Sequence, residues 1–125
     1  MNIVEKWRKF QIKNREIWDV ELSYLGEGVG HEEQNPHPCI VVKFNKFVDM
    51  ETIIPLTSNV QALKDFPYTS IITPDKTNGL TKKGIVMIYQ IRSLSKHRFL
   101  RQRGRVAKSD YDNIQIILKD YFQLF

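Results

Sequence analysis

The sequence predicts a mainly β fold, a small and strongly bent antiparallel barrel that ends in an α-helix. Three observations support this fold class. The chain has 125 residues, which is the size of one domain, so we expect residues 1–125 to form a single domain. Five or more short runs are rich in β-branched and aromatic residues and are bounded by Gly, Pro, Asn or Ser. The last stretch repeats apolar residues every three or four positions, which is typical of a helix that packs on a sheet.

The N-terminal third is expected to hold a short helix, one strand and a long loop. Apolar residues at helical spacing predict a helical extension within residues 1–12. Polar and apolar side chains alternate over Glu16–Leu22, which predicts a strand with one buried face. Residues 23–38 carry three alternating glycines and two prolines, so we expect a long, mobile hairpin loop. A nucleotide-binding loop is not favoured, because no helical run follows the glycines.

The middle of the chain is predicted to be a series of strands separated by turns. Gly84–Ile91 is the most apolar run and is expected near the centre of the sheet. Pro55 indicates an edge or a bulge, because proline has no N–H to donate to a neighbouring strand. The strands expected in this region are 38–44, 50–56, 68–73, 84–91 and 99–106, the last of them basic and twisted.

The C-terminal helix is predicted to begin at Ser109. Ser109 and Asp112 resemble a capping box, with Asp in place of the usual Glu or Gln. The apolar face that would pack on the sheet consists of Tyr111, Ile114, Ile117, Leu118, Tyr121 and Phe125.

Composition excludes several classes of protein. Hydrophobic residues make up 42% and charged residues 26%, which is the balance of a folded chain and not of a disordered one. No apolar run approaches the roughly 20 residues that a membrane span needs, and the charged N-terminus is unlike a secretory signal. The single cysteine, Cys39, rules out an internal disulfide and a cysteine zinc site. We therefore expect a cytoplasmic protein.

Positive charge is concentrated late in the chain. The formal net charge is +5, and residues 92–108 hold seven Lys or Arg and no acid. A basic run of this kind is either a solvated surface or a face that contacts phosphates, and both interpretations stay open at this point.

Four short motifs follow one another between Lys13 and the C-terminus. They are Glu16-Ile17-Trp18, then Gly30-His31-Glu32 with His37-Pro38, then Pro55-Leu56-Thr57-Ser58, and last Gln90-Ile91-Arg92-Ser93. In this order and spacing they resemble the MazF/PemK toxin family, including the Kid toxin, whose members carry G-[DE]-I-[WY], G-[SH]-E-Q-x-x-x-R-P, P-[IVL]-T-S and Q-[IP]-R-[TS].

The resemblance implies the toxin of a bacterial type II toxin–antitoxin system. Such toxins are ribosome-independent and metal-independent endoribonucleases that cut single-stranded mRNA and thereby stop translation and growth. The resemblance further implies an SH3-like barrel shared with the gyrase poison CcdB, a homodimer, and a small acidic antitoxin as partner. It implies no cofactor and no metal.

The chain departs from the family pattern at several positions. Arg15 stands where the family has the glycine before the acidic residue, and His37 stands where it has an arginine before proline. The PemK/Kid branch carries an arginine and an aspartate just before its Gln-Pro-Arg, where this chain has Met87 and Tyr89. The PemK-type histidine is kept as His31, followed by Glu32, and the other positions that match are Thr57, Gln90 and Arg92.

Candidate catalytic residues follow from what metal-free RNA cleavage requires. A base must take the proton of the 2′-hydroxyl, an acid must protonate the leaving oxygen, and donors must stabilise the charged phosphorane. The imidazoles of His31 and His37 suit the first two tasks, with Glu32 as a base or as a partner for an imidazolium. The hydroxyl of Thr57 and the guanidinium of Arg92 are candidates for binding the phosphate.

Further residues are candidates for binding RNA. Phe44, Phe47, Phe66 and Tyr68 could stack on bases, although core packing is the default for each. The polar and basic residues expected to contact RNA are Ser58, Gln90, Arg92, Lys96 and Arg98.

Other interpretations remain open for the same residues. Loop histidines are often only solvated side chains, and His31, Glu32, Glu33 and His37 could also bind a metal, although their spacing presets no geometry. The alternative function is a binding protein of the same fold without catalysis, either a gyrase poison or an inactive toxin homologue.

Overall fold

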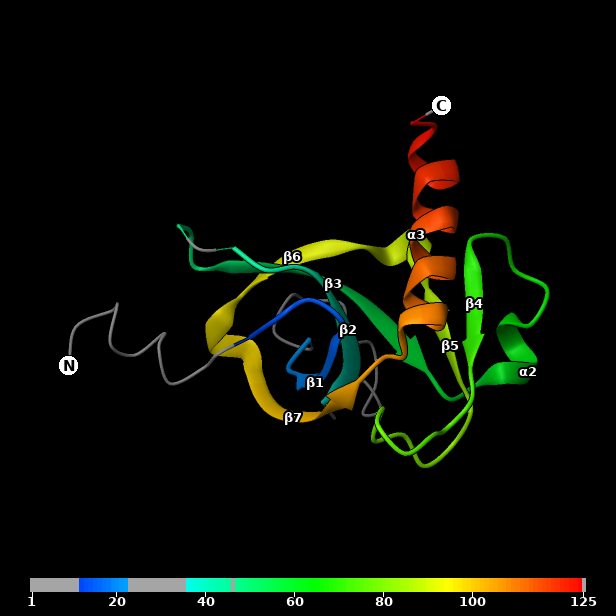
Figure 1. The fold of residues 1–125 in the computed structure, drawn as a ribbon, viewed down its shortest axis with the longest axis horizontal. Coiled ribbons are helices and arrows are strands. Elements are labelled where there is room, and N and C mark those ends of the chain that lie inside the picture. Colours follow the sequence, from blue (N-terminus) through cyan, green and yellow to red (C-terminus); the bar gives the residue numbers. More distant parts are fainter. Residues whose placement is uncertain (1–11, 23–35, 46, 125) are drawn as a thin grey trace.

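The structure is a computed structural model that describes residues 12–22, 36–45 and 47–124 (Figure 1). The described residues form an antiparallel sheet of seven strands with a C-terminal helix. In chain order the strands are β1 (Glu16–Val20), β2 (His37–Lys43), β3 (Met50–Thr57), β4 (Thr69–Ile72), β5 (Gly84–Met87), β6 (Arg92–Ser95) and β7 (Phe99–Arg105). The helices are α2 (Val60–Leu63), the 3-10 turns η3 (Ile88–Gln90) and η4 (Lys96–Arg98), and α3 (Lys108–Phe122).

The strands follow the order β4-β5-β3-β2-β1-β7, and β6 pairs separately with β3. All the pairings are antiparallel. Figure 1 shows the sheet curling strongly, with α3 packed beside the end that carries β4 and β5. The mainly β antiparallel fold with a terminal helix is therefore confirmed. Among the described strands the barrel is not closed by hydrogen bonds, because β4 and β7 lie at opposite ends of the pairing path.

The sheet is buried on both faces. Ile17 of β1 belongs to a core that also contains Tyr111 and Ile114 of α3. The next residue, Trp18, points to the other face and belongs to a second core inside the curl of the sheet. All five residues of β1 are buried, so the prediction of a strand with one exposed face was wrong. The polar residues of this strand, Glu16 and Asp19, are buried and paired: Glu16 accepts from the Nε1 of Trp18, and Asp19 accepts from Arg103.

Pro55 lies in the most extensively paired strand and in regular register opposite Cys39, so the expectation of an edge or a bulge at this residue was wrong. β3 pairs with β2 along one side. Along the other side it pairs with β6 through Ile53 and with β5 from Leu56 onward. Pro55 therefore lies at the point where β3 changes from one partner strand to the other. None of the described neighbouring strands needs a hydrogen bond from residue 55 there, so a residue without an N–H is tolerated.

The expected strand 84–91 consists of two elements, a shorter strand and a 3-10 turn. β5 ends at Met87, the turn η3 follows, and the N–H of Ile91 donates to the carbonyl of Ile88 (3.1 Å) before β6 begins. β5 does lie inside the sheet, between β4 and β3, as its apolar sequence predicted. The bounds of the other expected strands agree with the structure within two residues at each end. The largest difference is in the first strand, which was expected to end at Leu22 and ends at Val20.

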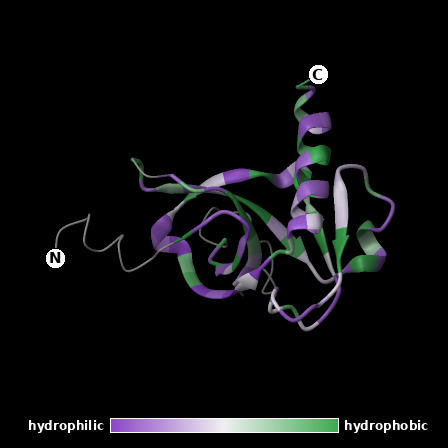
Figure 2. Cartoon of the chain, viewed as in Figure 1, coloured by the Kyte–Doolittle hydropathy of each residue, from purple (hydrophilic) through white to green (hydrophobic). Residues whose placement is uncertain are grey.

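The helix α3 starts without the expected capping box. Its N-cap is Ala107, and Asp112 instead accepts a hydrogen bond from the Nζ of Lys108 (2.8 Å). Tyr111 and Ile114 are buried, and Ile117, Leu118 and Tyr121 pack partly buried against the same core, as predicted. Figure 2 shows apolar and polar residues alternating along this helix. No helix in the described ranges is long and apolar enough to cross a membrane.

Candidate active site

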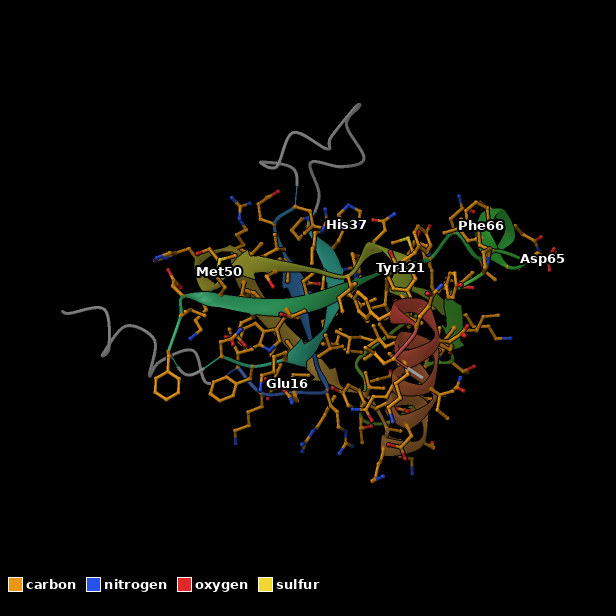
Figure 3. The ribbon with its side chains drawn as sticks, turned by 90° about the horizontal axis from the view of Figure 1, so that it is seen from above. Glu16, His37, Met50, Asp65, Phe66 and Tyr121 are labelled. Carbon is orange, nitrogen blue, oxygen red and sulfur yellow. The ribbon has the colours of Figure 1, made fainter. Side chains whose placement is uncertain are left out.

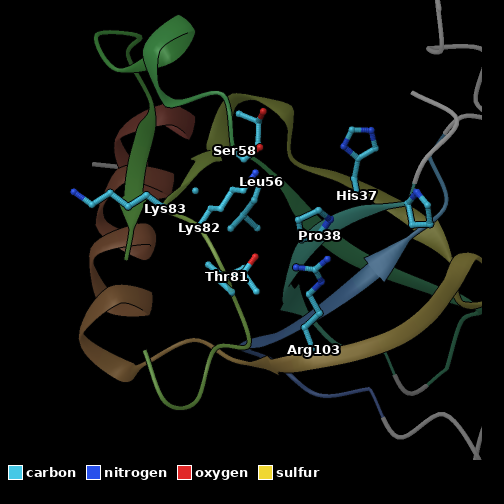
Figure 4. Close-up of a pocket in the computed structure, with 12 residues that line it drawn as sticks. His37, Pro38, Leu56, Ser58, Thr81, Lys82, Lys83 and Arg103 are labelled. Atoms are coloured by element: carbon cyan, nitrogen blue, oxygen red, sulfur yellow. The ribbon is translucent and has the colours of Figure 1, made fainter. Parts of the chain in front are cut away.

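A cavity of about 330 Å³ opens on the sheet where the ends of several strands meet (Figure 4). Its walls come from the start of β2, the end of β3, the segment that leads into β5, and β7. The residues that line it are Pro36, His37, Pro38, Leu56, Thr57, Ser58, Leu80, Thr81, Lys82, Lys83, Gly84 and Arg103.

Strand register explains why His37 and Thr57 share this cavity. β2 and β3 are antiparallel, and Cys39 lies opposite Pro55. Continuing the same register by two residues brings His37 to the level of Thr57. Thr57 in turn lies opposite Ile85 of β5, so the start of β5 reaches the same place. The Oγ1 of Thr57 accepts a hydrogen bond from the N–H of Asn59 (3.2 Å), which fixes the turn that presents Ser58.

The segment between β4 and β5 is fastened to β7 by its backbone. The N–H of Arg105 donates to the carbonyl of Thr77 (2.8 Å). A Cβ on Gly79 would lie 2.1 Å from the carbonyl oxygen of Arg103, and one on Gly104 would lie 2.3 Å from the carbonyl oxygen of Thr77. Only glycine allows so close an approach, and Gly79 also has a positive φ of 70°. This close contact positions the residues that follow, Thr81 to Lys83, so that they form part of the cavity wall.

A tight turn supports that contact. The Oδ1 of Asp75 accepts hydrogen bonds from the N–H groups of Thr77 and Asn78, each at 2.8 Å, and these bonds lower the pKa of the Asp75 carboxyl. The Asn78 side chain is fully buried and bridges the turn, since it donates to the carbonyl of Thr73 (3.0 Å) and accepts from the N–H of Leu80 (3.0 Å). The turn is therefore held independently of the cavity's own side chains.

The cavity is positively charged. Lys82, Lys83 and Arg103 are among its lining residues, and no carboxylate is among those that the structure describes. Asp19 of β1, which does not line the cavity, binds Arg103: its Oδ1 accepts a hydrogen bond from the Nε of Arg103 at 2.7 Å. An imidazole, three hydroxyls and several cations around one cavity suit the binding and proton transfer that phosphodiester cleavage needs.

The structure brings together three of the residues singled out from the sequence, namely His37, Thr57 and Ser58. His31, Glu32, the loop 23–35 and the helix expected within 1–12 fall outside the described residues, apart from Ile12, which is buried. Gln90 lies exposed in η3, and Arg92 begins β6 half-buried, where burial lowers the pKa of its guanidinium. Neither residue lines the cavity.

Lys96 and Arg98 are buried, which corrects their assignment as RNA contacts. The Nζ of Lys96 lies 3.5 Å from the Oε1 of Glu51 and donates to the carbonyl of Asn45 (3.0 Å). Arg98 donates from Nη1 to the carbonyl of Glu21 (3.1 Å). Both cations are used to hold strands together, so they are not available to a ligand at the surface.

The aromatic candidates are also away from the cavity. Phe44 and Phe47 are exposed near the connection between β2 and β3. Figure 3 shows Met50, at that end, on the opposite side of the molecule from Asp65 and Phe66. Phe66 packs near Tyr89 with 6.1 Å between ring centroids, and Tyr68 packs edge-on against Tyr121. None of the four lines the cavity.

Sequence reasoning missed the cations that do line it. Lys82 and Lys83 directly precede an apolar strand and follow a turn, which is a weak sign of a basic strand entry. Arg103 belongs to the basic run 92–108, but nothing in the sequence separates it from the neighbouring arginines. No group of three or more metal-ligating side chains occurs among the residues that the structure describes.

Comparison with known proteins agrees with this fold. The family described as "PemK-like, MazF-like toxin of type II toxin-antitoxin system" matches residues 13–122. A curated relative, Endoribonuclease MazF9 of Mycobacterium tuberculosis, is 28% identical over 122 residues, which are 91% of this chain and 98% of that protein.

Solved structures give the same result for the fold. An endoribonuclease from a mycobacterial species, in complex with its cognate antitoxin, superposes with a TM-score of 0.70 at 18% identity and covers 91% of this chain and 97% of that chain. MazF from Deinococcus radiodurans superposes with a TM-score of 0.68 at 18% identity and covers 90% of this chain and 96% of that chain. The chain belongs to the PemK-like, MazF-like family of toxins of type II toxin–antitoxin systems.

Proposed function

We propose that this toxin is a ribosome-independent, metal-independent endoribonuclease that cuts single-stranded mRNA and thereby stops translation and growth. One observation carries the proposal: a single positively charged cavity holds an imidazole, three hydroxyls and three cations. RNA is a polyanion, and its cleavage requires proton transfer next to a phosphate whose negative charge increases in the transition state. The name of the mycobacterial relative, an endoribonuclease, supports the same activity.

The roles follow from the chemistry of each side chain. His37 transfers a proton to or from the reacting oxygens, because imidazole exchanges protons near neutral pH. Thr57 and Ser58 donate hydrogen bonds to phosphate oxygens, and Lys82 offsets the negative charge of the phosphorane. His31 and Glu32 stay predicted candidates for the second proton transfer.

The partners of this site are proposed on the same basis. Single-stranded RNA is the substrate, and a small acidic antitoxin is the inhibitor, which is supported by the similar mycobacterial endoribonuclease solved with its cognate antitoxin. We propose a homodimer in the cytoplasm, where mRNA is translated. Exposed apolar residues on and just after α3, such as Ile116, Phe122 and Leu124, favour burial against a second copy. A monomer at micromolar concentration in light scattering would argue against that assembly.

The test of the activity is direct. Purified protein is incubated with a long single-stranded RNA in buffer with and without EDTA, and the products are separated by electrophoresis. We expect discrete fragments in both conditions, and growth arrest when the chain is expressed in bacteria. Intact RNA at a large excess of protein, together with inhibition of DNA gyrase, would favour the non-catalytic alternative.

A pair of histidine variants then tests the site. His37→Ala should lower the rate of cleavage by about 100-fold or more, which is the range that a general acid or base contributes. His97→Ala is the matched control, because His97 is exposed, lies 3.6 Å from Asp49 and does not line the cavity. Equal rates for the two variants would remove His37 from the mechanism.

A further inference from the structure

We propose that Arg103 binds the scissile phosphate of the RNA and that Asp19 is the residue that positions it. This inference rests on the proposed ribonuclease function and assigns two residues to it that the sequence motifs did not indicate. Arg103 lines the same cavity as His37 and Thr57, although it comes from a strand at the far end of the pairing path. In Figure 4 its side chain extends from β7 toward Pro38.

A bulge in β7 sets the position of Arg103. Ile17 of β1 lies opposite Gly104, and the next residue, Trp18, lies opposite Gln102. Arg103 is therefore the extra residue of an irregular pairing and has no partner of its own on β1. Bulges of this kind redirect a side chain, and they occur often beside active sites.

Asp19 fixes the guanidinium and leaves its outer face free. The Nε of Arg103 donates to Oδ1 of Asp19, while the Nε and Nη2 of Arg101 both donate to Oδ2 (3.2 and 2.9 Å). Within the described residues, the two terminal nitrogens of Arg103 make no hydrogen bond. Two parallel N–H groups on a held guanidinium are the arrangement that binds two oxygens of one phosphate.

Arg101 and Arg103 differ in where they lie, although they share the same carboxylate. The Arg101 side chain is 72% exposed and does not line the cavity, whereas that of Arg103 is 28% exposed and does. Asp19 is nearly buried and lies opposite Pro38, which is itself a cavity residue. One carboxylate paired with two arginines leaves a net positive charge, which favours a phosphate over a neutral ligand.

The two arginines provide a matched pair of variants. Arg103→Gln should lower the rate of RNA cleavage by about 100-fold, the usual loss when one donor to a transition-state oxyanion is removed. Arg101→Gln should keep the rate within about threefold, because it removes the same charge on the same strand without touching the cavity. Each variant leaves Asp19 one arginine, so their thermal stabilities should be similar. If Arg103→Gln fails to fold, Arg103→Lys is the second variant, because it keeps the positive charge. Its rate of RNA cleavage should still be at least about tenfold lower than that of wild type, because one ammonium cannot bind Asp19 and also bind a phosphate bidentately.

A second measurement separates phosphate binding from a purely structural role. RNA substrates with a single sulfur at one or the other non-bridging oxygen of the scissile phosphate are cleaved by wild type and by Arg103→Gln. We expect sulfur at either position to slow wild type by about tenfold, because both non-bridging oxygens accept from the Arg103 guanidinium and sulfur weakens a charge-assisted hydrogen bond. For both diastereomers the slowing should be much smaller in Arg103→Gln. Equal slowing of wild type and the variant would overturn the phosphate contact.

A double-mutant cycle tests the role of Asp19. Asp19→Asn should lower kcat by about tenfold in wild type and in Arg101→Gln, and should have no further effect in Arg103→Gln. Equal effects in all three backgrounds would overturn the positioning role. If wild type and Arg103→Gln cleave equally well, the inference is wrong and the ribonuclease function stands. If wild type itself does not cleave RNA, both are wrong.

Discussion

Lys96 and Arg103 belong to the same basic run, and the fold gives them opposite surroundings. Lys96 is buried beside Glu51, which is fully buried, near the start of β3. Arg103 lines the cavity at the other end of β3, where Thr57 is located. Thr57 is six residues along the strand from Glu51, which corresponds to roughly 20 Å. The difference teaches that a cluster of positive charge in a sequence does not define one surface. Each cation has a carboxylate partner, Glu51 for Lys96 and Asp19 for Arg103, so the burial of the cation itself decides whether it remains accessible to a ligand.

The largest effect is expected when the buried cation is removed. Lys96→Met should lower the free energy of unfolding by about 3 kcal/mol, because it leaves the Glu51 carboxylate buried without its partner. Cleavage per folded molecule should not change, since Lys96 does not line the cavity. Urea unfolding and activity at low temperature give the two quantities.

The exposed pair on the same run is the control for that prediction. Lys108 lies 2.8 Å from Asp112, and its side chain is 76% exposed. Lys108→Met should therefore change the free energy of unfolding by no more than about 0.5 kcal/mol. Equal destabilisation by the two variants would mean that burial does not distinguish the cations of this run.

The next largest effect concerns the segment that carries Lys82 to the cavity. Gly104→Ala should lower the free energy of unfolding by about 2 kcal/mol, because its Cβ would meet the carbonyl oxygen of Thr77, a backbone atom. Cleavage should fall with it, because the displaced segment moves the cavity wall. Gly84→Ala is the control for stability: its Cβ would lie 3.3 Å from Cδ2 of Leu56, the end of a flexible side chain, so the free energy of unfolding should fall less. Thermal unfolding of both variants and the cleavage rate of Gly104→Ala decide the matter, because Gly84 itself lines the cavity.

The smallest expected effect is a dependence of stability on pH. Burial raises the pKa of the Glu51 carboxyl, although Asn45 and Lys96 oppose the shift. The unfolded chain therefore loses this proton at a lower pH than the folded chain does. The resulting stabilisation is complete below the ordinary pKa of glutamate, and it is lost as pH rises through the raised pKa of the folded state.

Glu51→Gln removes this titration and leaves the other carboxyls in place. The stability of wild type relative to the variant should thus be highest at acid pH and should decrease as pH rises. Urea unfolding of both proteins at several values between about pH 4 and 8 measures the difference. A difference that is constant with pH would show that burial does not dominate at Glu51.

Much of this protein follows from local sequence. Strand positions, the apolar stripe of α3 and the order of the motifs depend on residues near one another in the chain, so composition and spacing predicted them. The errors arose where a distant partner intervened. β1 is covered on both faces by cores from other elements, and Asp112 is paired with Lys108 rather than used as a cap.

The candidate site divides in the same way. The motifs singled out His37, Thr57 and Ser58, which share one cavity because each lies at the end of a strand that the sequence already predicts. Arg103 and Lys82 enter the cavity only through the β7 bulge and the close backbone contact at Gly79 and Gly104. The chain order alone therefore determined the strands and the imidazole at their end, while tertiary structure decided which positive charges meet it. Charge–charge and backbone contacts act between residues far apart in sequence, and no local pattern records them.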